Sequence, residues 1–282
     1  KTELLLIGHP KRTAILNDFT IKIGGAAVRP SPCARNLGVL FDSGLTFNSF
    51  IQKTASTAVL HIKSLARVRD YLPQWLAKDL VNSLVLSRLD YCNSLLAGLP
   101  KKSIKPLQLA ENMASRLVFR ARKFDHVSPL LKELRWLPVD LRIQSKILTL
   151  THKASHDLAP TYLAELLHKF QPARVLRSSQ GDQLDQPFFR LRTVGDRSFC
   201  SAGPRLWNSL PQFLRSDIFF PSADSGTSFP AVLNCYFYAT HYLDCPPDCA
   251  TLLTFSLLQE RKAGMRSESH PGSKCAISNL SM

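Results

Sequence analysis

The feature that most constrains the fold of this 282-residue chain is a change of hydrophobic period near residue 46. After it, apolar residues recur every three or four positions, the spacing of one helix face; they are Phe47, Ile51, Ala55, Ala58, Ile62 and Leu65. Before it, apolar runs are short, and residues 19–23 alternate apolar and polar side chains as a half-exposed strand does. The predicted fold class is therefore α+β, and mainly α.

Residues 1–45 are predicted to form a small β unit. Residues 3–8 and 37–42 are short apolar runs that read as strands. Gly24-Gly25 separates FTIKI from AAV, and paired glycines supply the positive φ angles of a tight hairpin turn. A hairpin is therefore expected between residues 19 and 28.

Residues 46–170 are predicted to form a helical domain. After the first helix, a second is expected from about Trp75 through Leu96, and a third over 103–121. Ser128 and Asp140 are expected to cap two further helices, and another is expected over 160–170. Residues 171–217 are predicted to form a separate region with Trp207 as packing anchor. Residues 218–282 lack a sustained period and are expected to be a largely disordered tail.

The segment LDYCN, residues 89–93, gathers groups that also occur in active sites. On the predicted second helix, Asp90 falls on the polar face and Cys92 on the apolar face, nearly opposite each other. A thiol nucleophile needs a base within hydrogen-bonding distance, and no histidine is near in sequence. Cys92 is therefore interpreted as a small core residue. A hydrolase that uses Cys92 or a distant histidine remains the alternative.

The positive charge is confined to the first three quarters of the chain. Residues 1–217 hold 32 Lys and Arg against 16 Asp and Glu, whereas residues 218–282 hold 4 against 5. Such an excess attracts polyanions, chiefly nucleic acid. Arg116, Arg120 and Lys123 are expected to form a basic stripe on the third helix, where it would track phosphates or be an ordinary solvated face. Solubility alone is the other explanation of the charge.

No catalytic or metal-binding constellation is found. The chain has no G-x-S-x-G elbow, no phosphate-binding glycine loop and no adjacent pair of aspartates. His241, Cys245 and Cys249 follow Cys235, but their spacing differs from the C-x2-C pattern of zinc sites. We therefore predict no catalytic residue, no metal ligand and no cofactor in this chain.

The expected setting is intracellular, either nuclear or cytoplasmic. Seven cysteines cannot all pair within one chain, and no N-terminal secretory signal is present. The longest apolar stretches, near residues 229–243 and 250–258, are shorter than the roughly 20 residues of a membrane-spanning helix. No membrane association is therefore expected.

Seven blocks of the sequence resemble the C-terminal part of a non-LTR (LINE-type) retrotransposon reverse transcriptase. They occur in the order seen in that family and cover roughly residues 1–217. The blocks are KTELLLIG (1–8), LGVLFD (37–42), LVLSRLDYCNSLLAGLP (84–100), LQLAENMASRLVF (107–119), DHVSPLLKELRWLPVDLRIQSKIL (125–148), APTYLAELL (159–167) and GPRLWNSLPQFLR (203–215).

The resemblance implies a polymerase layout for these residues. Residues 1–45 would be the end of the palm, with Leu37, Gly38 and Val39 in the strand that helps to seat the primer terminus. The helices that follow would be the thumb, which holds a template–primer duplex of RNA or RNA–DNA by its backbone. The residues expected to contact nucleic acid are Lys53, Lys63, Arg67, Arg116, Arg120 and Lys123.

The family's aspartates that bind Mg²⁺ precede the segment that corresponds to KTE, and its endonuclease domain would also be missing. The chain is therefore expected to be an inactive remnant that binds nucleic acid without sequence preference, with Mg²⁺ only in a full polymerase. After Asp217 the resemblance stops, and a frame shift, a splice or read-through is hypothesised there. The alternative function is a non-enzymatic helical adaptor whose exposed apolar faces bind a protein partner.

Overall fold

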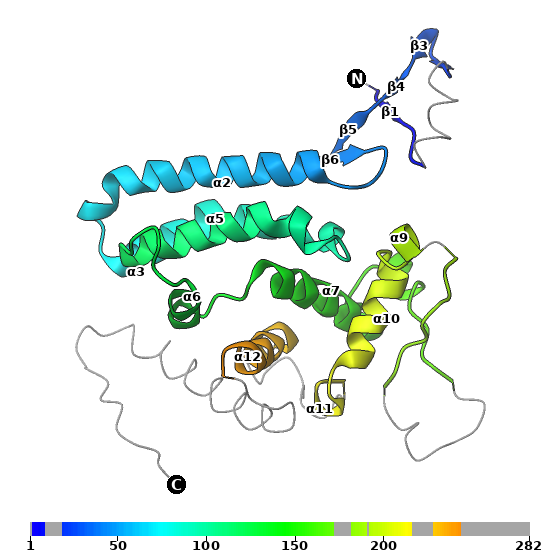
Figure 1. The fold of residues 1–282 in the computed structure, drawn as a ribbon. Helices are drawn as coiled ribbons and strands as arrows, with labels where there is room; N and C mark the ends of the chain where they lie inside the picture. The colour runs from blue at the N-terminus through cyan, green and yellow to red at the C-terminus, as the bar shows by residue number, and fades with distance from the viewer. Residues whose placement is uncertain (1, 9–18, 172–181, 191, 216–227, 244–282) are drawn as a thin grey trace. The chain divides into compact units, whose positions relative to one another are not determined.

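The computed structural model describes residues 2–8, 19–171, 182–190, 192–215 and 228–243. These residues form two compact units. The first comprises the described parts of Lys1–His168 and Asp185–Leu206, and the second those of Lys169–Leu184 and Trp207–Met282. Most described residues are helical, and the strands are short and confined to the N-terminal part, as the sequence predicts (Figure 1).

Three two-stranded ladders make up the N-terminal β region. They are β1 (Leu4–Leu5) with β4 (Pro30–Ser31), parallel, and two antiparallel pairs, β2 (Ile21–Ile23) with β3 (Ala26–Val28) and β5 (Cys33–Asn36) with β6 (Val39–Asp42). The predicted hairpin at Gly24-Gly25 is confirmed, since both glycines have positive φ and join β2 to β3. The predicted strand over 37–42 is shorter, because Leu37 and Gly38 form the turn of the second hairpin.

The helical part of the first unit follows directly. Its longer elements are α2 (Asn48–Val68), α3 (Gln74–Val81), α5 (Lys101–Phe119), α6 (Ser128–Leu134) and α7 (Val139–Ser155). Its shorter elements are η1 (Arg69–Tyr71), the π-helical η2 (Asn82–Leu86), α4 (Ser87–Asp90), η3 (Asn93–Leu96), α8 (Thr161–Ala164) and α9 (Arg192–Gly195). All six apolar residues of the predicted first helix face, from Phe47 to Leu65, are buried.

The second predicted helix ends earlier than its apolar spacing suggests. Helix α4 stops at Asp90, Tyr91 is extended, and Cys92 takes a left-handed conformation with φ 52°. Val81, Val85 and Leu89 are buried as predicted, but Cys92 lies beyond the helix. The prediction that Asp90 and Cys92 occupy opposite faces of one helix is therefore wrong, because the backbone turns between them.

Three helices end in the same backbone motif with a residue other than glycine in the left-handed region. Arg120, Arg135 and Asp157 have φ between 54° and 57° after α5, α6 and α7. In each case the next residue donates to a carbonyl five residues back, as Ala121 does to Arg116 at 2.9 Å. Helix α7 begins at Val139, whose N–H donates to the Gln108 side chain, so Asp140 lies inside the first turn and is not its cap.

Helix α10 (Phe199–Ser209) contributes to both units, and the second unit adds α11 (Gln212–Arg215) and α12 (Phe229–Tyr242). Trp207 is buried there, as predicted, and its Nε1 donates to the carbonyl of Asp182 at 2.7 Å. The side chain of Asn208 exchanges two hydrogen bonds with the backbone of Leu184. The Trp-Asn pair thereby holds a distant strand-like segment against the helix.

Helix α12 lies inside the segment that was expected to be a disordered tail. Its apolar residues cover most of its circumference, including Phe229, Leu233 and Phe237, all of which are buried. Its polar side is narrow, with Asn234 and His241 exposed, so the sequence shows no clear 3.6-residue period. Residues 218–227 and 244–282 lie outside the described part of the chain.

We predict that Gly203→Ala destabilises the first unit. A Cβ at Gly203 in α10 would lie 2.9 Å from Oγ1 of the buried Thr151 in α7. Overpacking costs about 1–3 kcal/mol, which exceeds the helix-propensity gain of alanine, about 1 kcal/mol. Urea denaturation should show a lower free energy of unfolding for Gly203→Ala and recovery in Gly203→Ala/Thr151→Ala. A stabilised single variant would contradict the close approach.

Candidate nucleic-acid interface

The surface of α2 carries basic charges and no acidic ones. Lys53, Lys63 and Arg67 are exposed, and Asn48–Val68 contains no aspartate or glutamate. The helix has 21 residues and, at a rise of 1.5 Å per residue, is about 30 Å long. Three of the predicted contact residues therefore lie along one uninterrupted helix.

Helix α5 lies beside α2 and extends this basic surface (Figure 1). Lys101, Lys102 and Lys105 are exposed near its N-terminus, while its only acidic residue, Glu111, is completely buried. Basic side chains at a helix N-terminus oppose the helix dipole, at a cost of about 0.3–1 kcal/mol each. Sequence reasoning missed these three lysines, although the pattern KKSIK after Pro100 was a readable signal.

The predicted stripe of Arg116, Arg120 and Lys123 is not one helix face. Helix α5 ends at Phe119, and Arg120 reverses the backbone. Arg116 donates from Nη2 to the carbonyl of Asp125 at 3.1 Å, and only Arg120 and Lys123 are exposed. The prediction of an i, i+4, i+7 stripe is therefore wrong in geometry, because the helix stops one residue before its second member. Whether these residues contact nucleic acid stays a prediction.

A second arginine, Arg69, binds the backbone at the C-terminal end of α5. Its guanidinium is buried and donates to three carbonyls: Leu117 at 2.9 Å, Leu72 at 2.7 Å and Val118 at 2.5 Å. Burial and the nearby Arg120 charge lower the pKa of Arg69. A cation at a helix C-terminus satisfies carbonyls that have no partner within the helix.

Arg120 in turn binds the backbone of the segment that carries Arg69. Its Nη2 donates to the carbonyls of Arg69 and Asp70, both at 3.1 Å. Each arginine therefore binds backbone carbonyls beside the other, and the C-terminal ends of α2 and α5 are tied together. The two helices consequently run parallel, although a hydrophobic pattern alone does not specify their relative direction.

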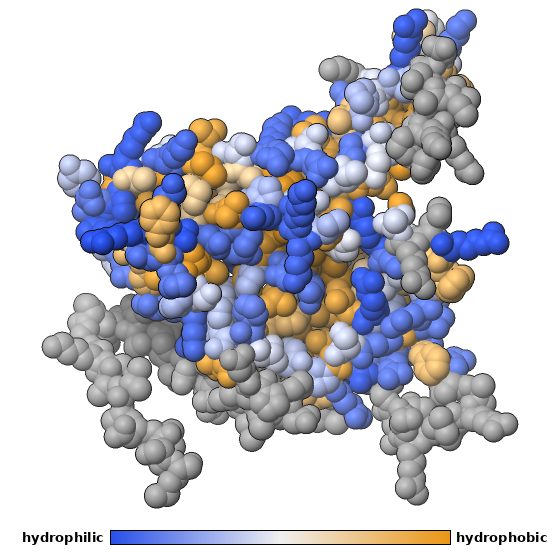
Figure 2. Space-filling view, in the orientation of Figure 1, coloured by the Kyte–Doolittle hydropathy of each residue, from blue (hydrophilic) through white to orange (hydrophobic). Residues whose placement is uncertain are grey.

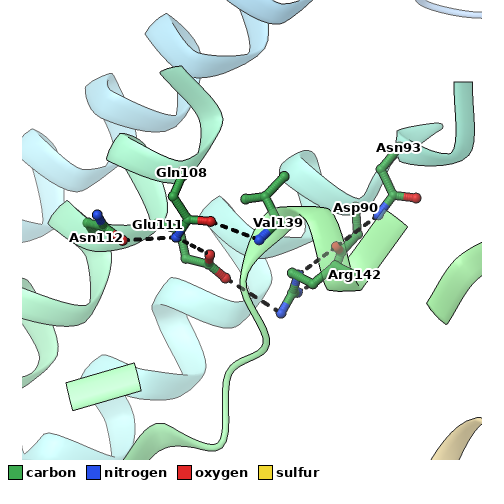
Figure 3. A network of polar contacts seen from close by, with 7 residues as sticks. All are labelled: Asp90, Asn93, Gln108, Glu111, Asn112, Val139 and Arg142. Atoms are coloured by element: carbon green, nitrogen blue, oxygen red, sulfur yellow. Dashed lines mark hydrogen bonds and ion pairs between the residues drawn. The ribbon is translucent and has the colours of Figure 1, made fainter. Parts of the chain in front are cut away.

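The residues Asp90 and Glu111 belong to a polar network inside the helical unit (Figure 3). Arg142 of α7 binds both oxygens of Asp90, with Nε to Oδ1 at 2.9 Å, and its Nη1 lies 3.8 Å from Oε1 of Glu111. Gln108 donates to Glu111 at 2.9 Å and accepts from the N–H of Val139. The network joins α4, α5 and α7.

Burial and the neighbouring charges shift the pKa values of Glu111 and Arg142 in this network. Burial raises the pKa of Glu111 to about 7, although Arg142 and Gln108 act to lower it. Burial disfavours the charge of Arg142, but hydrogen bonding and charge from Asp90, together with Glu111, raise its pKa. Asp90 thus neutralises the largely buried Arg142. Within LDYCN, Asp90 therefore has a structural role, whereas Cys92, which was interpreted as a core residue, is only half-buried.

The predicted primer-seating residues lie at the tip of the second hairpin. The Leu37 side chain is 83% exposed and Gly38 completes the turn, whereas Val39 is buried. The hydroxyl of Tyr91 donates to the carbonyl of Leu37 at 2.5 Å. The structure therefore brings the block LGVLFD into direct contact with LDYCN, which lies within the block at residues 84–100. A role of this tip at a primer terminus stays a prediction.

Arg197 joins three loops of the first unit. It donates to the carbonyls of Ala97 at 3.2 Å and Leu45 at 2.9 Å, and its guanidinium lies over the Phe47 ring. The loop before α2 is also held by Asp42, which accepts hydrogen bonds from the N–H groups of Thr46 and Phe47. Burial alone would raise the pKa of Asp42, but these bonds lower it.

In the described ranges, no three His, Cys, Asp or Glu side chains are grouped to hold a metal ion. Cys245 and Cys249 of the H-x3-C-x3-C segment lie outside those ranges. None of the helices that the structure describes combines the length and apolar character needed to span a bilayer.

We predict that Arg69→Met lowers the free energy of unfolding by about 3 kcal/mol, because several carbonyls at the end of α5 lose a charged donor. The matched control is Arg67→Met, two residues away and exposed, which should change stability by less than about 0.5 kcal/mol. Urea denaturation of both variants checks this. Equal effects of the two substitutions would contradict the role assigned to Arg69.

We predict that Glu111→Gln removes a pH-dependent component of stability. The folded pKa of Glu111, about 7, lies above its ordinary value of 4.5. The folded chain therefore binds the proton more tightly, and the free energy of unfolding falls as pH rises from about 4.5 to about 7. Between those limits the free energy of unfolding of the wild type should fall by on the order of 2–3 kcal/mol more than that of the variant.

Urea denaturation at several pH values between these limits measures the difference. Glu133→Gln is the matched control, since Glu133 is exposed on α6, and its profile should follow that of the wild type. Parallel profiles for wild type and Glu111→Gln would mean that folding does not raise the pKa of Glu111 above its ordinary value of 4.5.

Comparison with known proteins finds no match, whether to a protein-family profile, a curated protein or a solved structure. The resemblance to reverse transcriptases accordingly remains an inference from the seven sequence blocks.

Proposed function

We propose that the helical unit binds the phosphate backbone of RNA or an RNA–DNA duplex without sequence preference, as the thumb-like part of a retrotransposon-type reverse transcriptase. One observation carries the proposal: two adjacent parallel helices expose basic side chains and no carboxylate. The exposed residues are Lys53, Lys63, Arg67, Lys101, Lys102 and Lys105. The order of the seven sequence blocks supports the polymerase origin.

The dimensions of the helix pair suit a duplex. Each phosphate contacted by a lysine or arginine releases condensed counterions, and this supplies affinity that does not depend on base sequence. Because α2 and α5 are parallel, Lys53 lies toward the same end of the pair as Lys101–Lys105, while Lys63 and Arg67 lie toward the other. A length of about 30 Å is comparable to one helical turn of a nucleic-acid duplex, which is about 34 Å in B-form DNA. Both ends of the pair can thus meet phosphates of one bound duplex.

A second candidate function is protein binding by the same helices. Leu109 and Met113 of α5 are partly exposed four residues apart, and Leu60 of α2 is 62% exposed. Exposed apolar side chains at helical spacing suit a helical partner. Association driven by such contacts persists at high salt, which distinguishes it from phosphate binding.

We predict that the affinity for an RNA–DNA duplex falls steeply between about 50 and about 200 mM KCl, and equally for unrelated sequences. In Lys53→Ala/Lys63→Ala/Arg67→Ala the slope of log K against log salt should decrease by up to about 3, since each lost duplex contact removes about 0.9. Fluorescence anisotropy with labelled duplexes measures both quantities.

The charge-matched control is Lys146→Ala/Lys153→Ala/Arg205→Ala, which removes three exposed cations from α7 and α10. This control should retain most of the affinity and slope. Equal losses in the two triple variants would show that total charge, not the α2 surface, determines binding. Binding that is unchanged by salt would overturn the proposal and favour the protein-binding alternative.

A further inference from the structure

Three aromatic side chains are exposed at the end of the helical unit where α2 and α5 terminate. The Tyr71 side chain is 87% exposed, Trp75 66% and Phe124 89%. They lie in η1, in the first turn of α3 and in the loop after α5. We call this set, with the neighbouring cations Arg67, Arg120 and Lys123, the aromatic end.

The aromatic end is held together by hydrogen bonds already described. Arg69 and Arg120 each donate to backbone carbonyls beside the other, so the loop that carries Tyr71 lies against the residue that opens the loop of Phe124. Arg116 donates to the carbonyl of Asp125, next to Phe124. Tyr71 and Phe124 are thus presented by segments whose backbones are tied to two helix ends.

Positive charge accompanies these rings. Arg67, Arg120, Arg122 and Lys123 are exposed, and Nζ of Lys123 lies 5.6 Å from the centre of the Phe124 ring. Two acids lie among these cations: Asp70 is exposed and lies 3.8 Å from Arg120, and the Asp125 carboxylate accepts the N–H of Arg122. In Figure 2, hydrophilic side chains project at the end of the unit where α2 finishes, with apolar ones among them.

Aromatic rings interspersed with cations match the chemistry of single-stranded nucleic acid. Bases stack on aromatic side chains while phosphates pair with lysine and arginine, and such stacking tolerates any base because every base has a π-face. Bases within a duplex are already stacked on each other and offer only their edges. The rings can therefore stack on unpaired nucleotides, whereas they find few stacking partners along a blunt duplex.

We propose that the aromatic end binds unpaired nucleotides, that is, a single-stranded extension of a nucleic acid whose duplex part lies on α2 and α5. The placement of the duplex part rests on the function proposed above. The extension contributes affinity by stacking, whereas the duplex contributes it by phosphate contacts. The chain accordingly prefers a junction of duplex and single strand to either form alone.

The chain carries its own probe for this site. Of its three tryptophans, Trp136 and Trp207 are buried, with 5% and 2% exposure, so Trp75 is the exposed one. A base stacked on Trp75 quenches its fluorescence. The experiment compares a blunt RNA–DNA duplex with the same duplex carrying a single-stranded extension of about six nucleotides, by anisotropy and by tryptophan fluorescence.

The wild type is expected to bind the extended duplex about tenfold more tightly, the effect of about one stacked base, with quenching only in that case. Tyr71→Ala/Trp75→Ala/Phe124→Ala, which removes all three rings, should bind both duplexes with nearly equal affinity. Tyr71→Phe keeps the ring and should keep the preference. The matched control is Phe188→Ala, which removes another ring, 87% exposed, elsewhere in the same unit, and should behave as the wild type.

Equal affinity of the wild type for blunt and extended duplexes would overturn this inference while leaving the proposed function standing. Failure of the blunt duplex to bind in a salt-dependent way would instead remove the proposed function. Trp75 quenching that depends on protein concentration without nucleic acid would also overturn the inference, because the aromatic end would then be a contact between copies of the chain.

Discussion

The reciprocal binding of Arg69 and Arg120 determines how the helical unit is arranged. A buried guanidinium is costly unless its donors are satisfied, and Arg69 meets this demand only when the last turn of α5 lies directly against η1. That requirement makes α2 and α5 parallel and places the loops after both helices side by side. The basic surface of the two helices and the exposed rings beyond them both depend on this closure.

The helices were more predictable than the connections between them. The spacing from Phe47 to Leu65 identified α2 and its buried face, because tertiary packing selects the same stripe that the sequence displays. The end of the second helix was missed, since apolar spacing continued past Asp90 although the backbone turns at Cys92. Helix α12 was missed for the opposite reason, because a helix that is apolar on nearly all sides shows no period.

The candidate site was predictable only for side chains that remain on a regular helix. Lys53, Lys63 and Arg67 were identified because α2 runs unbroken through all three. Arg116 and Arg120 were assigned to one stripe, but a left-handed residue at the helix end redirects them, and no propensity rule marks arginine for that position. The burial of Arg69 and the partial burial of Arg142 could not be identified, since their partners are backbone carbonyls or acids about 50 residues away.

Some residues in the left-handed region carry backbone strain, and their side chains make contacts that offset it. Gly24 and Gly25 occupy positive-φ positions with open space around them, so a side chain there would gain nothing. Phe47 and Arg120 occupy the same region of conformational space at a cost of about 1–2 kcal/mol each. Phe47 packs on Phe41 and Arg197, and Arg120 binds two carbonyls. Glycine would relieve the backbone at either position, but the loops would lose the side chains that define their shape.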